Sequence, residues 1–154
     1  MKKYFLLLVI FAACFSSCRK IVTNDTTMSQ AATDDALIQA YIKQYNVTAI
    51  KDPSGLYYQI ITPGTGAHPT DVSNITVGYT FTLIDGTAIE TKSSTYFANL
   101  GGLIQGWRIG LPKIGAGGKI ILLVPSALGY GTAGSGSVPA NAVLVYTITL
   151  QGFN

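Results

Sequence analysis

Residues 103–111 read LIQGWRIGL, and they are the one helical candidate inside a region that otherwise consists of strands and turns. Pro112 follows directly and ends the helix, because proline has no backbone N–H to donate. Gly106 precedes the only tryptophan of the chain, Trp107, and a residue without a Cβ atom lets a helix approach a sheet closely. We therefore expect a short helix that lies against a sheet, with the indole face of Trp107 as the floor of a cavity.

Segments with the composition of strands lie on both sides of this helix in the sequence. They are rich in β-branched and aromatic residues, and they cover residues 56–61 (LYYQII), 74–84 (NITVGYTFTLI), 87–91 (TAIET), 119–124 (KIILLV) and 142–151 (AVLVYTITLQ). Asp85-Gly86, between the second and third segments, is typical of a tight hairpin. An antiparallel sheet with one short helix is an α+β domain.

An additional helix is predicted over residues 34–46, before the strands begin. Thr33 is a suitable N-cap, and the following Asp34 and Asp35 place negative charge in the first turn, which favours a helix start. One apolar stripe follows at helical spacing, and it consists of Leu37, Ile38, Tyr41, Ile42 and Tyr45. This stripe either packs against the main domain or forms a contact between two copies of the chain.

The N-terminus has the features of an export signal. Lys2 and Lys3 precede the 12-residue apolar run 4–15, whereas a membrane-spanning helix needs about 20 residues. Small residues precede both Cys14 and Cys18, which resembles a bacterial lipoprotein signal, in which the cysteine is acylated. Cys18 is the favoured lipidation residue because the complete apolar run then lies upstream. Cys14 as the lipidated residue, or an ordinary cleaved secretory signal, is the alternative.

These features divide the chain into four parts. The expected parts are a lipoprotein signal peptide (1–17), a flexible tether (18–32), an N-terminal helix with a linker (33–53) and the β-rich domain (54–154). A lipid anchor on Cys18 would hold the domain at a membrane surface. The expected location is therefore the bacterial cell envelope, facing the periplasm.

Charge and the distribution of ionisable residues argue against several classes of function. The formal net charge of +3 falls to +1 without Lys2 and Lys3, so no basic stripe is left to bind nucleic acid. All seven acidic residues lie at or before Glu90, and His68 is the only histidine. This composition does not suit paired-carboxylate hydrolysis, serine–histidine–aspartate catalysis or histidine-rich metal sites. We expect neither a metal nor a cofactor.

Four aromatic residues fall on different elements of this plan. Tyr79 lies in a strand, Trp107 on the short helix, Tyr130 after Leu128-Gly129, and Tyr146 in the last strand. Aromatic rings with few polar groups among them could line a pocket that binds an apolar ring. They could equally be core residues of a β-rich domain, and composition alone favours the core.

Residues 54–154 resemble an FKBP-type peptidyl-prolyl cis–trans isomerase domain. The stretches that carry the resemblance occur in the family's order, and they are residues 54–58 (SGLYY), 63–66 (PGTG), 77–80 (VGYT), 85–90 (DGTAIE), 103–111 (LIQGWRIGL), 124–131 (VPSALGYG) and 138–146 (VPANAVLVY). The resemblance implies an FKBP-like half-barrel, in which an antiparallel sheet of about five strands wraps around the short helix. A proline-binding pocket would lie between sheet and helix.

The resemblance also implies roles for individual residues. Trp107 would lie beneath the prolyl ring, and the hydroxyl of Tyr130 would reach a substrate carbonyl. The walls of the pocket would be formed by Tyr79, Leu103, Ile104, Val138 and Tyr146.

One pair of residues near the expected pocket departs from the family's pattern, and the orientation of another pair stays open. Ile89 and Glu90 occupy the positions of the family's usual Phe-Asp pair. We expect Ile89 to narrow the apolar wall, and Glu90 to shape the polar rim through a hydrogen bond to Tyr79 or to another polar neighbour. Either Tyr96 or Phe97 points into the pocket.

The predicted function is rotation of X–Pro bonds, which assists the folding of envelope or exported proteins. Rotation meets a barrier of about 18–20 kcal/mol, but no covalent bond breaks, so the reaction needs no nucleophile, metal or acid–base pair. The expected partners are proline-containing polypeptides and, through the lipid anchor, a membrane. Two alternatives stay open: a catalytically weak chaperone or peptide-binding lipoprotein with the same pocket, and an unrelated structural lipoprotein.

Overall fold

The computed structural model describes residues 28–154, apart from the side chains of residues 92–94. The predicted signal peptide, both cysteines and the first part of the tether lie outside the described residues. Within residues 28–154, no helix combines the length and the apolar character that crossing a membrane requires.

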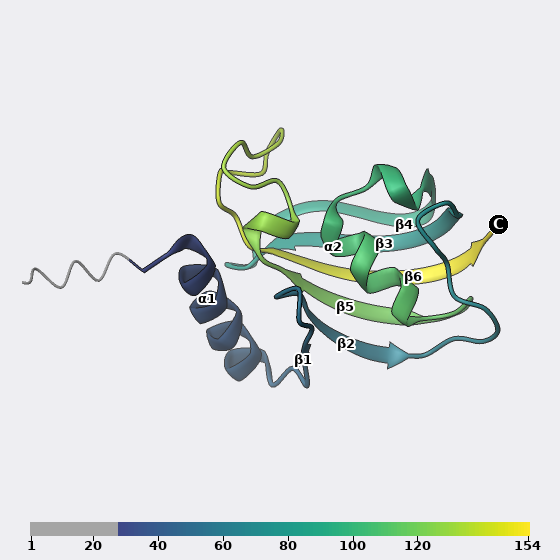
Figure 1. Ribbon diagram of the computed structural model, residues 1–154, viewed down its shortest axis with the longest axis horizontal. Coiled ribbons are helices and arrows are strands. Elements are labelled where there is room, and N and C mark those ends of the chain that lie inside the picture. Colours follow the sequence, from purple (N-terminus) through teal and green to yellow (C-terminus); the bar gives the residue numbers. More distant parts are fainter. Residues whose placement is uncertain (1–27) are drawn as a thin grey trace, which may run out of the picture.

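Six antiparallel strands form one sheet in the order β1-β2-β5-β6-β3-β4 (Figure 1). The strands are β1 (Ile50–Lys51), β2 (Tyr57–Thr62), β3 (Asn74–Leu83), β4 (Ala88–Asn99), β5 (Lys119–Val124) and β6 (Leu144–Phe153). The predicted hairpin joins β3 to β4, and Gly86 takes the left-handed conformation there at φ 90°. The five longer strands overlap the segments that the sequence predicts, although β4 extends eight residues beyond the predicted end at residue 91, and β1 adds a two-residue edge strand. The α+β architecture is thus confirmed.

The helix α2 (Gln105–Gly110) lies across one face of this sheet (Figure 1). Two glycines permit the close contact. A Cβ atom on Gly106 would lie 2.6 Å from Cγ1 of Val124, and one on Gly110 would lie 2.6 Å from Cδ2 of Leu122. Both of these neighbours belong to β5, so the predicted close approach of helix and sheet is confirmed. Three short 3₁₀ helices complete the domain: η1 (Leu100–Gly102), η2 (Leu111–Lys113) and η3 (Ser126–Leu128).

Buried apolar side chains form two clusters on opposite faces of the sheet. Along β5, Leu122 and Val124 belong to the cluster beneath α2, whereas Leu123 belongs to the other cluster, because side chains alternate between the faces of a strand. The larger cluster contains Trp107. The smaller cluster contains the fully buried Ile38 of the N-terminal helix, which therefore covers the second face at one end.

The N-terminal helix α1 (Gln30–Tyr45) begins earlier than the predicted residue 34. Its N-cap is Ser29 rather than Thr33, because the Ser29 hydroxyl accepts a hydrogen bond from the backbone N–H of Ala32 at 3.3 Å. Residues 30–32 therefore belong to the helix and not to the tether. Asp34, expected in the first turn, therefore lies beyond that turn, and it is buried.

Candidate functional site

A cavity of about 100 Å³ lies between α2 and the sheet. It is lined by side chains from β3, β4, the α2 region, the segment after η3 and β6: Tyr79, Phe81, Glu90, Tyr96, Leu103, Ile104, Trp107, Tyr130 and Tyr146. A dry apolar cavity of about 150 Å³ accommodates benzene. The cavity is thus of the size that suits one small ring.

Trp107 forms the centre of an aromatic cluster in this cavity. The side chain is only 4% exposed. Its ring meets that of Tyr79 at a centroid distance of 5.2 Å and that of Tyr146 at 5.3 Å, both edge to face. Phe81 stacks on Tyr146 with centroids 4.4 Å apart. Since such contacts stabilise the rings in fixed orientations, the apolar surface is formed before any ligand binds.

The polar groups of the cavity are few and belong mostly to tyrosines. The hydroxyl of Tyr79 donates a hydrogen bond to Oε2 of Glu90 at 2.5 Å. The sequence alone had left open whether Glu90 bonds to Tyr79 or to another polar neighbour. Burial, followed by this bond to Glu90, raises the pKa of Tyr79 well above its usual range. Burial, followed by the nearby Tyr130, raises the pKa of Tyr146 in the same way. Both hydroxyls therefore remain protonated, neutral donors at ordinary pH.

Seven of the nine residues predicted for the site line the cavity. They are Tyr79, Glu90, Leu103, Ile104, Trp107, Tyr130 and Tyr146. Three of them lie on neighbouring strands, because the order β6-β3-β4 places Tyr146, Tyr79 and Glu90 side by side in the sheet.

Ile89 and Val138, the other two predicted site residues, do not line the cavity. Ile89 lies at an irregularity of the β3–β4 pairing, where Phe81 pairs with Glu90 and Thr82 pairs with Ala88. Its side chain packs against the larger core cluster instead. Val138 is buried in a turn closed by reciprocal backbone hydrogen bonds with Ser135, and it too contributes to the core.

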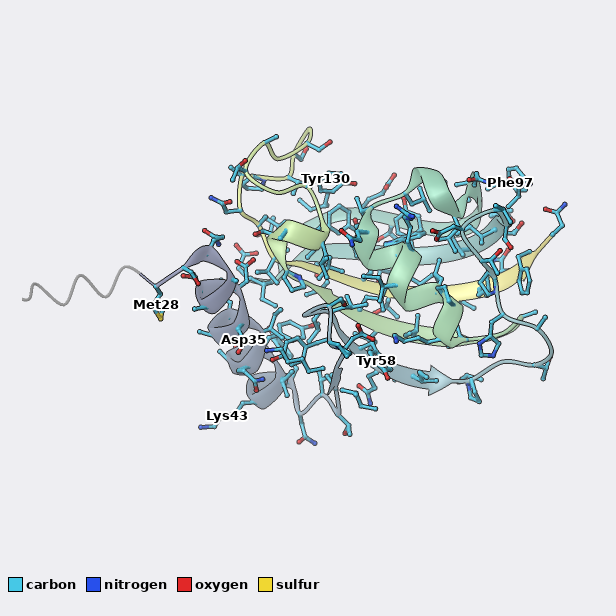
Figure 2. The ribbon with its side chains drawn as sticks, in the orientation of Figure 1. Met28, Asp35, Lys43, Tyr58, Phe97 and Tyr130 are labelled. Carbon is cyan, nitrogen blue, oxygen red and sulfur yellow. The ribbon has the colours of Figure 1, made fainter. Side chains whose placement is uncertain are left out.

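The structure also identifies lining residues that the sequence did not. Phe81 was missed, although it lies two positions after Tyr79 and strand alternation places both on the same face. Of the open pair, Tyr96 lines the cavity and contacts the ring of Tyr79 at 5.6 Å. Phe97 is 62% exposed and lies well away from Tyr130 in Figure 2.

Residues 65–151 match the family model of FKBP-type peptidyl-prolyl cis-trans isomerases. The chain is 40% identical over 100 residues to the FKBP-type peptidyl-prolyl cis-trans isomerase FkpA of Escherichia coli, which covers 63% of this chain and 37% of that protein. It is 34% identical over 133 residues to the outer membrane protein MIP of Legionella longbeachae, covering 82% of this chain and 55% of that protein.

Solved structures give the same result. The crystal structure of FkpA from Escherichia coli matches with a TM-score of 0.72 at 33% sequence identity, covering 80% of this chain and 61% of that one. In the sequence comparisons, the chain spans only 37% of the length of FkpA and 55% of that of MIP. The match of the family model over more than half of the residues shows that the chain belongs to the FKBP-type peptidyl-prolyl cis-trans isomerase family.

Proposed function

We propose that this chain catalyses cis–trans isomerisation of X–Pro bonds and binds the prolyl ring in the cavity on Trp107. The observation that carries the proposal is the small cavity with the nearly buried indole at its base and aromatic rings around it. The barrier to rotation, about 18–20 kcal/mol, comes from the loss of amide resonance. A site that binds the twisted amide more tightly than the planar amide lowers this barrier without any covalent step.

The proposed roles follow from the chemistry of each side chain. Trp107 contacts the pyrrolidine ring, while Leu103 and Ile104 exclude water from one side of it. Tyr130 provides a hydroxyl that can donate to a substrate carbonyl. Glu90 orients the Tyr79 ring through the 2.5 Å hydrogen bond between them. A twisted amide has a less polarised carbonyl than a planar one, so an apolar wall disfavours the planar form more.

A protease-coupled assay with a short prolyl peptide tests this function in the full chain. Uncatalysed isomerisation takes tens of seconds or longer, so turnover by the protein is readily resolved. Trp107→Ala should remove most of the turnover, and Trp107→Phe should retain part of it. The indole N–H has no hydrogen-bond partner among the described residues, so the phenylalanine variant loses ring area but no hydrogen bond.

Phe97→Ala is the matched control, because Phe97 is an exposed aromatic residue on β4 that does not line the cavity. It should turn over the peptide like the wild type. If a prolyl peptide quenches the Trp107 fluorescence of the wild-type protein but the protein shows no turnover, the alternative of a peptide-binding chaperone would be supported. Full activity of Trp107→Ala would contradict the site assignment.

We also propose that the domain is anchored in the bacterial cell envelope by acylation of Cys18 and acts on proline-containing exported polypeptides. The apolar run before Cys18 supports export, and a relative named an outer membrane protein supports the location. Labelling of producing cells with radioactive palmitate tests the anchor. Cys18→Ser should abolish the label, and Cys14→Ser should retain it. The reverse pattern would assign the anchor to Cys14, and no label on the wild type would favour an ordinary secretory signal.

A further inference from the structure

Asp34 is a buried carboxylate on the N-terminal helix α1, outside the cavity. Its side chain is 1% exposed. Oδ2 accepts hydrogen bonds from the backbone N–H of Ser126 at 2.8 Å and from the Ser126 hydroxyl at 2.7 Å. Oδ1 accepts a third from the side-chain amide of Gln30 at 2.6 Å. Burial of a carboxylate is costly unless it is hydrogen-bonded, and these three bonds satisfy it.

Ser126 is the first residue of η3, and Asp34 completes the start of that short helix. The first N–H groups of a helix lack intrahelical acceptors. Pro125, at the cap position of η3, makes no side-chain cap hydrogen bond. Asp34 supplies the acceptor from a position 92 residues earlier in the chain. The N-terminal end of α1 lies beside η3 in Figure 1, consistent with this contact.

The carbonyl group of the same Ser126 holds the backbone on both sides of Tyr130. It accepts hydrogen bonds from the N–H of Gly129 at 3.0 Å and from the N–H of Gly131 at 2.9 Å. Tyr130 lies between these two glycines and lines the cavity. A continuous set of hydrogen bonds therefore links the carboxylate of Asp34 to the turn that carries the Tyr130 ring.

We propose that Asp34 is a positioning residue, which acts through Ser126 to hold the turn that places the Tyr130 hydroxyl at the cavity. The kinetic consequence rests on the isomerase function proposed above. A misplacement of about 1 Å in a catalytic group can lower a rate by up to about 100-fold, so a carboxylate that never touches the substrate can still affect turnover. Helix α1 is then a functional part of the isomerase unit.

Three variants of the full chain test the proposal in the prolyl-peptide assay. Asp34→Ala removes the acceptor and should lower kcat/KM by about tenfold. Asp34→Asn keeps one oxygen for Ser126 and should restore kcat/KM to within about twofold of the wild type. Asp35→Ala is the matched control. Its carboxylate bonds to Lys51 and Tyr57 on β1 and β2, not to η3, so the variant should keep kcat/KM.

A second background separates positioning from general destabilisation. In Tyr130→Phe protein the hydroxyl that Asp34 positions is gone, so adding Asp34→Ala should lower kcat/KM by less than about twofold. A tenfold loss that persists in this background would overturn the proposal. So would wild-type kcat/KM in folded Asp34→Ala protein. If Asp34→Ala does not fold, Ser126→Ala provides the test, since it keeps the backbone bond and should lower kcat/KM by about threefold.

Amide hydrogen exchange gives a readout that does not depend on activity. In Asp34→Ala, protection of the Gly129 and Gly131 amides should fall by at least about tenfold, while protection of the Leu122 amide in β5 stays unchanged. Unchanged protection of the two glycines would overturn the proposal. If the wild type shows no turnover, the proposed function fails, and this exchange measurement still decides whether Asp34 orders the turn.

Discussion

The hydroxyl of Tyr79 on β3 donates a 2.5 Å hydrogen bond to Oε2 of Glu90 on the neighbouring strand β4. The Tyr79 ring also contacts the indole of Trp107 edge to face. One side chain therefore connects the polar edge of the cavity with its aromatic floor. Because the pKa of Tyr79 is raised, chiefly by burial, its hydroxyl stays protonated and able to donate across the pH range of ordinary assays.

Glu90→Ala should lower kcat/KM for a prolyl peptide by about tenfold, because a hydrogen bond to a charged group contributes about 1.5–3 kcal/mol and its loss frees the Tyr79 ring. Glu90→Gln keeps an oxygen acceptor, and its kcat/KM should stay within about threefold of the wild type. Steady-state kinetics on the two variants check this prediction. Equal activities of the alanine and glutamine variants would show that the bond to Tyr79 does not organise the site.

Gly106→Ala should destabilise the fold by about 1–3 kcal/mol, the usual range for overpacking a core. The new Cβ atom would lie 2.6 Å from Cγ1 and 2.9 Å from Cγ2 of Val124, so α2 or β5 must move. Denaturant unfolding measures the free energy. Movement of α2 also displaces Trp107, so turnover should fall in the same variant.

Two further variants serve as controls for Gly106→Ala. A Cβ atom on Gly102, in η1, would meet nothing within 4 Å, so Gly102→Ala should unfold like the wild type. The double variant Gly106→Ala/Val124→Ala lacks both clashing methyl groups, so it should lose less stability than the sum of the losses of Gly106→Ala and Val124→Ala measured singly. If the loss of unfolding free energy in the double variant equals the sum of the two single losses, the steric explanation is wrong.

Stability at acid pH should depend on Asp52. Its carboxylate accepts a hydrogen bond from Nζ of Lys113 at 2.7 Å, and further bonds from the backbone and hydroxyl of Ser54 at 3.0 and 2.7 Å. These bonds, with Lys113 first, lower the pKa of Asp52 from 3.8 to about 2. Since the folded state has the lower pKa, the stabilisation is complete above about pH 4 and disappears as the pH falls towards 2.

The measurement for this prediction is the free energy of unfolding of wild type and Asp52→Asn between pH 5 and about pH 2. The wild type should lose about 1–2 kcal/mol more than the variant over this interval. Other carboxylates titrate in both proteins, so the difference between the two curves isolates Asp52. If the unfolding free energies of wild type and Asp52→Asn run parallel against pH, the assigned contact between Asp52 and Lys113 would be contradicted.

Local patterns sufficed to predict the short helix, whereas composition alone favoured a solid core over a cavity. Gly106, Trp107 and Pro112 lie within seven positions, and they indicate where the helix can approach the sheet closely and where it ends. The strand segments and the Asp85-Gly86 turn are equally local features. The resemblance to the FKBP family then placed Tyr79, Tyr130 and Tyr146 around the indole, and the structure brings them together.

Of the features that sequence reasoning missed, Phe81 follows from strand alternation, whereas others depend on pairing and on contacts that local patterns do not encode. Ile89 was expected in the wall, but the irregular pairing of β3 with β4 directs Glu90 to the cavity instead, and strand periodicity does not reveal such a shift. Ser29 and Thr33 are both acceptable helix caps. The hydrogen bond between Asp34 and Ser126 joins residues 92 positions apart, so local patterns do not reveal it.

NMR spectroscopy of a short prolyl peptide with catalytic amounts of the full chain tests the central claim most directly. We expect exchange cross-peaks between the cis and trans peptide, together with transferred contacts from the prolyl ring protons to the indole protons of Trp107, and loss of most of the exchange in Trp107→Ala. Exchange at the wild-type rate in Trp107→Ala would contradict the assignment of Trp107 to the catalytic site. So would rapid exchange in the wild type without any contact between the prolyl ring and the indole.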